Sequence, residues 1–154
     1  MKSNKDNWMK ENLRTTHYAD GTAIPAGTTT SYSAYRYAPN NDESNVATYG
    51  YLYNWPAVMH GATSSSDNPS NVQGICPAGW HMPSDAEWTQ LTTYVYNNGY
   101  QCPGCSGVSN AAKVDCIAKA LASQTGWNSS GITYAVGNNP SIKLQGFSVR
   151  CVRD

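Results

Sequence analysis

The segment PSDAEWTQLTTYVYNNG, residues 83–99, constrains its own local structure more than any other part of the sequence. Ser84 and Glu87 form a capping box, in which the hydroxyl accepts from the third helical amide and the carboxylate accepts from the amide of the cap. The apolar residues that follow recur at helical spacing: Trp88, Leu91 and Val95. Because the Asn-Asn-Gly run is a stop signal, the segment predicts a helix over Asp85–Asn97.

The rest of the chain predicts short elements joined by long loops. A second helix is expected at Ala111–Ser123, and a short helix ends near His60-Gly61 with Pro56 in its first turn, where a missing N–H costs little. Extended segments are expected at Trp8–Tyr18, running into a turn at Asp20-Gly21, at Ser31–Ala38 and, as a closing strand, at Lys143–Val152. Trp80 and Trp88 are expected in the core.

Length and charge narrow the class of protein. The 154 residues, of which 40% are hydrophobic, suffice for a single domain spanning 1–154. Only 13% of residues are charged, with Lys+Arg and Asp+Glu equal at 10 each. Nucleic acid and anionic membranes are therefore poor partners, because both need a positive face. There is no apolar run of about 20 residues for membrane insertion, and the first residues do not form a signal peptide.

Five cysteines indicate disulfides if the compartment is oxidising, and an odd one is left over: Cys76, Cys102, Cys105, Cys116 and Cys151. Cys102-Pro-Gly-Cys105 has the spacing of half a zinc site or of a redox dithiol. A zinc site would need a fourth ligand beside Cys116, such as His81 or His17, and no spacing selects one. A local disulfide, Cys102 or Cys105 with Cys116, is the preferred interpretation.

Tyrosine is the dominant aromatic residue, with 11 Tyr against 1 Phe. Tyrosine with Ser, Gly and Asn makes adaptable binding faces, and Tyr32 and Tyr53 lie in such runs. The candidate ligand-binding residues are Tyr35, Tyr37, Tyr49, Tyr51, Tyr134 and Asn138. The histidines, each isolated in sequence, are interpreted as polar surface or strand-end residues rather than catalysts: His17, His60 and His81.

Several segments, taken together and in order, resemble one family: NWMKENLRTTHYADGT, YGYLYNWPAV, ICPAGWHMPSDAEWTQL, IAKALASQTGW and GFSVRCVRD. They resemble the Fibrobacter succinogenes major paralogous domain, exported bacterial domains distantly similar to formylglycine-generating enzymes and C-type-lectin-like folds. The resemblance implies an α+β, C-type-lectin-like fold with a small antiparallel sheet, paired N- and C-terminal strands and two to three flanking helices. It also places Cys76 and Cys151 in core segments, within disulfide distance.

The resemblance is incomplete near the end of the chain. The family pattern continues for several dozen residues after a stretch like AVGNNP, whereas here a few residues lead directly to the ending. This shortening would leave a sheet edge or an apolar face uncovered, so self-association is expected through Ile132, Tyr134, Val136 and Ile142.

The leading hypothesis is a non-enzymatic, extracytoplasmic binding module that recognises a glycan or protein surface, on a bacterial envelope or a phage particle. The alternative is a structural domain that forms homo-oligomers through sheet edges. A formylglycine-generating-type oxidase is least supported, because Cys151 matches only the terminal segment and no upstream cysteine matches the active-site run. No cofactor is expected. Loop carboxylates could ligate calcium, although no EF-hand-like spacing supports it.

Overall fold

The strands of this protein are two residues long, and they form two separate antiparallel sheets in the part of the chain that the computed structural model describes, residues 8–98 and 145–154. One sheet pairs β1 (Arg36–Tyr37) with β2 (Leu52–Tyr53), and the other pairs β3 (Trp80–His81) with β4 (Val152–Arg153). The helices are η1 (Pro39–Asn41), η2 (Glu43–Asn45), α1 (Val46–Tyr49), α2 (Trp55–Met59) and α3 (Asp85–Asn97). The protein is therefore a small domain of mixed helix and sheet.

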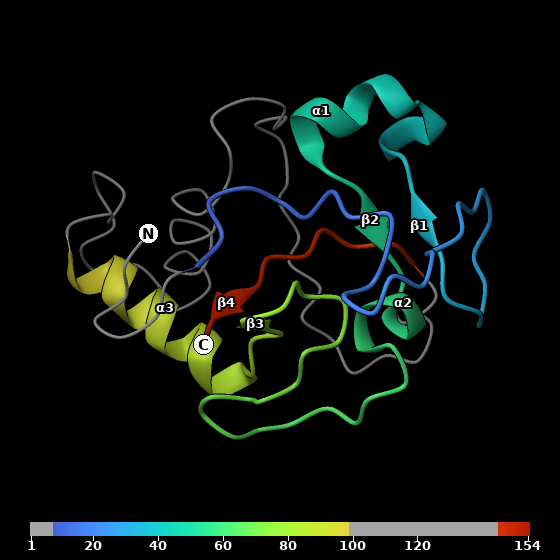
Figure 1. Cartoon of the computed structure of the whole chain (residues 1–154). Coiled ribbons are helices and arrows are strands. Elements are labelled where there is room, and N and C mark those ends of the chain that lie inside the picture. The colour runs from blue at the N-terminus through green and yellow to red at the C-terminus, as the bar shows by residue number, and fades with distance from the viewer. Residues whose placement is uncertain (1–7, 99–144) are drawn as a thin grey trace.

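The C-terminal segment, residues 145–154, links the two sheets (Figure 1). Phe147 forms an antiparallel bridge with Tyr53 of β2, and Val152 pairs with His81 of β3. On its other side Val152 bridges Trp8, so this end of the chain lies between the N-terminal segment and β3. The pairing of N- and C-terminal segments that the family resemblance implies is thus present.

Two backbone hydrogen bonds extend that pairing, from Met9 N to Cys151 O (3.0 Å) and from Leu13 N to Val149 O (2.9 Å). Cys151 is also joined to Cys76 by a disulfide, with the Cα atoms 5.9 Å apart. This is the pairing expected from the resemblance. The bridge connects residues 75 positions apart, and closing so long a loop stabilises a fold by about 4 kcal/mol in the chain-entropy model.

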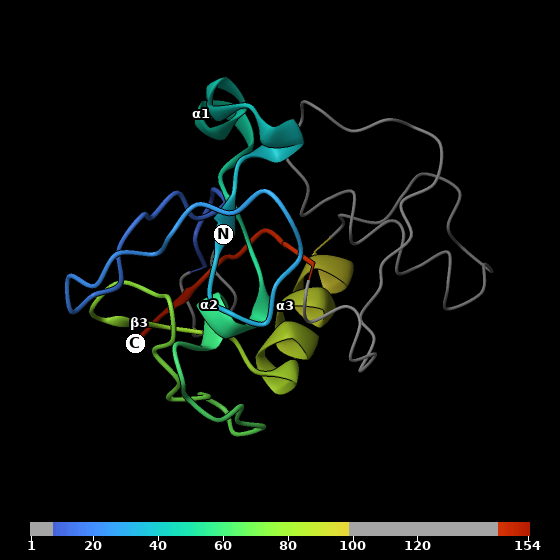
Figure 2. The same ribbon diagram turned by 90° about the vertical axis from the view of Figure 1, so that its right-hand side faces the viewer.

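The apolar side chains gather in two clusters. The larger one packs Leu13, Ile24, Tyr53, Val58, Ile75 and the disulfide among its members. The smaller one lies under α3 and consists of Trp8, Leu91, Val95 and Val152. Figure 2 shows α1 at the top of the described part of the chain and the loop that follows α2 at the bottom. The two apolar clusters lie between them.

Both helices expected among the described residues are confirmed. The main helix, α3, spans Asp85–Asn97, and its capping box is complete: Ser84 Oγ accepts from Glu87 N at 3.3 Å, and Ser84 N donates to Glu87 Oε2 at 2.9 Å. The shorter one, α2, ends at Met59 with His60 in the left-handed region, and Pro56 stands in its first turn. Leu91 and Val95 are buried as expected.

Trp88 corrects the sequence analysis, which expected it in the core. Its side chain is 39% exposed, because it lies at the rim of the apolar face of α3 and covers Trp8, with the ring centroids 4.6 Å apart. Trp80 is half-buried against the larger cluster. The extended segment from Trp8 and the turn at Asp20-Gly21 are both present, with Gly21 at φ 86°.

Several expectations lie outside the described residues. They are the helix over Ala111–Ser123, the pairing of Cys102, Cys105 and Cys116, the candidate binding residues Tyr134 and Asn138, and the self-association surface at Ile132, Tyr134, Val136 and Ile142. Of the expected closing strand over Lys143–Val152, the described part contains the bridge at Phe147 and the start of β4.

Candidate functional site

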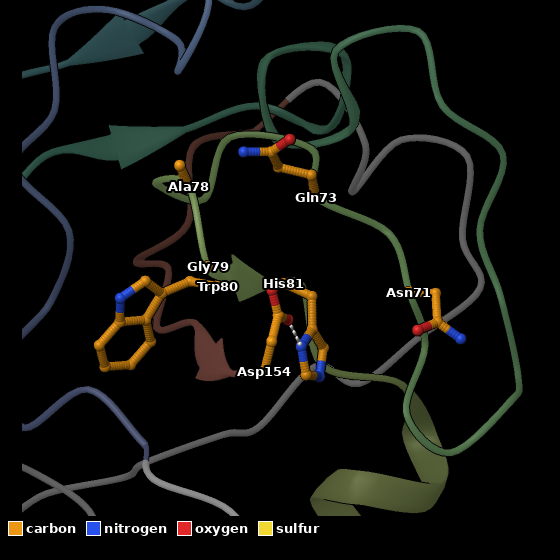
Figure 3. Close-up of a pocket in the computed structure, with 7 residues that line it drawn as sticks. All are labelled: Asn71, Gln73, Ala78, Gly79, Trp80, His81 and Asp154. Carbon is orange, nitrogen blue, oxygen red and sulfur yellow. Dashed lines mark hydrogen bonds and ion pairs between the residues drawn. The ribbon is translucent and has the colours of Figure 1, made fainter.

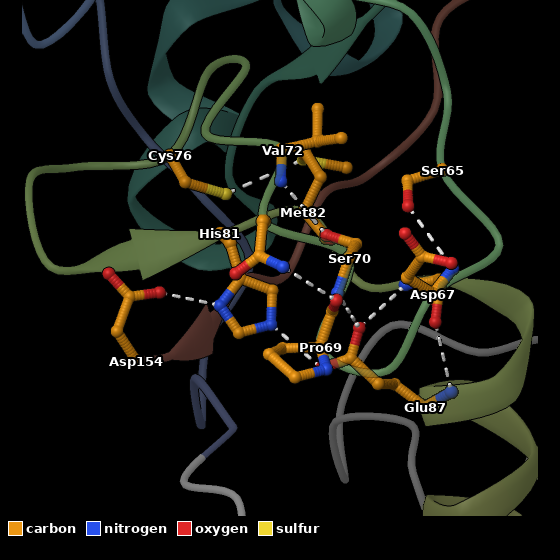
Figure 4. A network of polar contacts seen from close by, with 12 residues as sticks. Ser65, Asp67, Pro69, Ser70, Val72, Cys76, His81, Met82, Glu87 and Asp154 are labelled. Atoms are coloured by element: carbon orange, nitrogen blue, oxygen red, sulfur yellow. Dashed lines mark hydrogen bonds and ion pairs between the residues drawn. The ribbon is translucent and has the colours of Figure 1, made fainter.

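His81 is buried at the centre of a polar network between β3, β4 and α3 (Figure 4). Its Nε2 lies 2.7 Å from Glu87 Oε1, and its Nδ1 lies 2.6 Å from Asp154 Oδ1. The Glu87 side chain is fully buried at the start of α3, whereas that of Asp154 is 60% exposed. The imidazole ring therefore connects an interior carboxylate to a surface carboxylate.

A carboxylate beside each ring nitrogen favours the charged form of His81. A carboxylate only accepts hydrogen bonds when ionised, and only the imidazolium form carries a proton on both ring nitrogens. Burial lowers the pKa of His81, but the hydrogen bonds from Glu87 and Asp154 outweigh burial, and the pKa ends above its usual value. Burial likewise raises the pKa of Glu87, but hydrogen bonds from Ser84 and His81 lower it on balance. Between the lowered pKa of Glu87 and the raised pKa of His81, both members of the interior pair carry a charge.

Glu87 also organises the loop that precedes β3. Its Oε2 accepts from Ser70 N at 3.2 Å as well as from the amide of the cap. The Ser70 hydroxyl in turn donates to Met82 O and accepts from Val72 N at 3.2 Å. One buried carboxylate thus positions the helix, the strand histidine and residues 70–72 of the loop.

A small open pocket of about 250 Å³ lies beside this network, between the loop and β3 (Figure 3). It is lined by Asn71, Gln73, Ala78, Gly79, Trp80, His81 and Asp154. Asn71 occupies the left-handed region at φ 57°, which Asn tolerates better than most residues. The backbone amide of Asp154 donates to Gly79 O at 3.1 Å, which fixes β4 against the pocket wall. Trp80 and His81 are consecutive in a strand, so their side chains point to opposite sides.

The polar groups beside the pocket are largely engaged with one another. Both ring nitrogens of His81 are engaged by carboxylates, so the ring has no nitrogen left to accept a proton from a nucleophile. The nearby Ser70 hydroxyl donates to a backbone carbonyl instead. Among residues 8–98 and 145–154 there is no group of three or more His, Cys, Asp or Glu placed to hold a metal ion.

The candidate tyrosines do not form one exposed face. Tyr51 is buried, with its hydroxyl donating to Glu43 Oε2 at 2.7 Å. Tyr53 is fully buried and donates to Thr15 O, and burial raises its pKa far above the usual range. The structure thus buries Tyr51 and Tyr53, both of which the sequence analysis associated with a binding face. Alternation places both on the same side of the chain, and that side faces the core.

Tyr35, Tyr37 and Tyr49 stay closer to the surface. Tyr35 and Tyr37 are partly buried at β1, with ring centroids 6.4 Å apart, and the Tyr37 hydroxyl donates to Thr29 O at 3.1 Å. Tyr49 is 36% exposed at the end of α1. None of the three lines the pocket beside β3.

Sequence reasoning missed the residues that the structure brings together: Asn71, Gln73, His81 and Asp154. His81 was interpreted as a surface or strand-end residue, and it does end a strand, but it is buried. The capping box was the available signal, because it brings the Glu87 carboxylate to the helix start and leaves that group oxygen atoms for another partner. Asp154 lies 73 positions from His81, and no local pattern links them.

The fold and the network define a small disulfide-linked domain of mixed helix and sheet, with a polar pocket at a loop–strand junction. The chain belongs to the Fibrobacter succinogenes major domain family, whose model matches residues 1–139. No curated protein and no solved structure matches the chain. Within the described residues, no helix has the length and hydrophobicity that a membrane span requires.

Proposed function

We propose that this domain is a non-enzymatic binding module with a C-type-lectin-like architecture, which recognises a glycan or protein surface outside the cytoplasm. The observation that carries the proposal is the pocket beside β3, which is lined by hydrogen-bonding side chains and adjoins a His81 ring whose two nitrogens are both engaged by carboxylates. Binding residues are commonly placed on loops that a fixed scaffold positions, and here a loop supplies Asn71 and Gln73.

The Cys76–Cys151 disulfide supports the extracytoplasmic part of the proposal. Disulfides persist in oxidising compartments and are rare in the cytosol. Both cysteines are fully buried, so the bridge belongs to the core and not to a surface thiol pair. Peptide mapping of the oxidised protein without reductant should recover the two cysteines in one linked peptide, and recovery of both as free thiols would contradict the pairing.

The lectin-like architecture is supported by the position of the chain ends. The N-terminal segment and the C-terminal segment lie antiparallel and hydrogen-bonded, with α3 packed against them through Leu91, Val95 and Val152. We expect the domain to be part of a bacterial envelope or a phage particle, with its loops presented on the side away from the paired chain ends. No cofactor is needed for such a role.

A glycan array combined with a pull-down from bacterial surface extract tests the proposed function directly. The full chain should retain a defined glycan or a defined surface protein, and heat-unfolded chain at the same concentration should not. If the folded chain retains nothing in either assay, the binding-module proposal is wrong.

A further inference from the structure

The size of the pocket beside β3 limits what it can bind. Pockets for drug-sized ligands enclose roughly 300–1,000 Å³, and this one is smaller, about 250 Å³, and open to solvent. It therefore suits one ring-sized group at the end of a larger molecule. An extended peptide would need a longer groove with alternating side-chain subsites.

The lining is chemically suited to hydroxyl groups. Asn71 Nδ2 donates to Pro69 O at 3.1 Å and Gln73 Nε2 donates to Cys76 O at 3.4 Å, so each amide keeps its oxygen as an acceptor and one N–H as a donor. The Asp154 carboxylate, which also lines the pocket, accepts only. A sugar hydroxyl also both donates and accepts, so vicinal hydroxyls can satisfy an amide and a carboxylate together. Few side chains in the lining are apolar, which disfavours a hydrophobic ligand.

The charge balance disfavours anionic ligands and weakens the attraction for cationic ones. No Lys or Arg is among the described residues that line the pocket, and both N–H groups of His81 are already used. An anionic ligand would therefore meet Asp154 without a compensating donor. The imidazolium of His81 is shared between Asp154 and Glu87, and Glu87 also accepts from backbone amides. Part of the Asp154 charge is therefore offset, and an ammonium group is attracted less than it would be by an unpaired carboxylate.

Asp154 is also held in place before any ligand arrives. Its Oδ1 contacts His81 Nδ1 at 2.6 Å, while its backbone amide is bound to Gly79. His81 does not use Oδ2, and the side chain is 60% exposed. Immobilising a side chain on binding costs conformational entropy, and the contact with His81 has already restricted the Asp154 side chain before binding.

We propose that this pocket binds a neutral sugar residue, with Asp154 as the principal acceptor of its hydroxyl hydrogens and Asn71 and Gln73 as the flanking amides. This inference rests on the proposed function and specifies its ligand class and its site. His81 is a positioning residue in this arrangement, since it fixes Asp154 and has no free ring nitrogen for the sugar.

The test compares pocket variants with matched surface variants of the full chain on one glycan array, followed by NMR titration with free neutral, amino and acidic hexoses. Asp154→Asn and Gln73→Ala change the pocket, and Asn71→Gly removes an amide without straining its left-handed backbone. Asp67→Asn and Gln90→Ala make the same chemical changes at exposed positions outside the pocket. Thermal unfolding midpoints identify any variant that loses binding through unfolding.

We expect a neutral hexose to bind with a Kd on the order of 1 mM, and each folded pocket variant to bind at least tenfold more weakly. Asp67→Asn and Gln90→Ala should bind as the wild type does. Glycan or protein binding that all pocket variants retain would refute the pocket while leaving the proposed function standing. Selective binding of acidic or amino sugars, or of a lysine-containing surface protein through Asp154, would refute the ligand class. Absence of binding to every probe would contradict both proposals.

Discussion

Two buried polar groups hold different parts of this domain together: the neutral side chain of Asn54 and the charged pair of His81 and Glu87. Asn54 is fully buried at the start of α2. Its Oδ1 accepts from Tyr35 N and Ala57 N, and its Nδ2 donates to Ser31 O and Ser33 O. His81 and Glu87 are buried near β4 and are satisfied largely by each other's charge.

The two groups differ in whether their hydrogen bonds depend on pH. Every partner of Asn54 named above is a backbone group that keeps its hydrogen-bonding character at any physiological pH. The bonds of His81 exist together only in its imidazolium form. Asn54 holds the loop before β1, whereas His81 and Glu87 hold the residues around the proposed sugar pocket. Stability at the pocket should therefore depend on pH, and stability around Asn54 should not.

The largest expected effect comes from removing the buried charge of Glu87. Glu87→Gln keeps the shape of the side chain but leaves His81 without its interior counter-charge. Losing one partner of a buried ion pair costs about 3–5 kcal/mol, and we expect about 3 kcal/mol in the free energy of unfolding from urea titration at pH 6. Asp85→Asn, an exposed acid in the same first turn, should cost less than about 1 kcal/mol. Equal effects would mean that Glu87 acts only through the helix dipole.

Asn54→Ala is expected to cost about 2–3 kcal/mol. The substitution leaves buried amides and carbonyls without a partner, and one such group costs about 1–3 kcal/mol. The loss should be the same at pH 6 and pH 8.5, in contrast to that of Glu87→Gln, which should shrink as His81 loses its proton. A pH-dependent loss for Asn54→Ala would remove the contrast between the two sides.

Ser84→Ala should lower the free energy of unfolding by about 1 kcal/mol, because the helix loses the hydroxyl half of its capping box. Ser84→Thr keeps a capping hydroxyl and serves as the matched control. An urea midpoint for Ser84→Ala equal to that of the wild type would mean that α3 does not depend on this cap.

The smallest effect is the pH dependence of the wild type. His81 has a raised pKa, so its contribution is complete below its ordinary value of 6.5 and is lost as the pH rises through the raised pKa. Glu87 has a lowered pKa, so its contribution is present above its ordinary 4.5 and is lost as the pH falls through the lowered pKa. Urea midpoints should therefore peak between about pH 4.5 and 6.5. A midpoint that keeps rising from pH 6.5 to 8.5 would contradict a raised His81 pKa.

Local signals explain what could be predicted from the sequence. The α3 helix follows from residues within three positions of its cap, and α2 follows from Pro56 and the glycine after His60. These signals act over one helical turn and do not require knowledge of the rest of the chain. The family resemblance supplied the long-range Cys76–Cys151 pairing, which spacing alone left open.

The candidate site depends on long-range contacts, and for that reason it was not predicted. Tyr51 and Tyr53 are two positions apart and therefore share a side of an extended chain, and their rings are 6.2 Å apart in the structure. This spacing cannot show which side faces the core. Similarly, His81 meets Asp154 only because β3 pairs with β4. The Asn54 hydrogen bonds join the start of α2 to carbonyls 21 and 23 positions away, a relation that no local pattern specifies.

The most direct test of this account is the protonation state of the His81 ring, observed by imidazole nitrogen NMR across a pH titration. The account predicts a titration midpoint above 6.5, with protons on both Nδ1 and Nε2 below that midpoint, and a lower midpoint in Glu87→Gln. A midpoint at or below 6.5, or a ring that carries a single proton at pH 6, would contradict a charged His81 between two carboxylates.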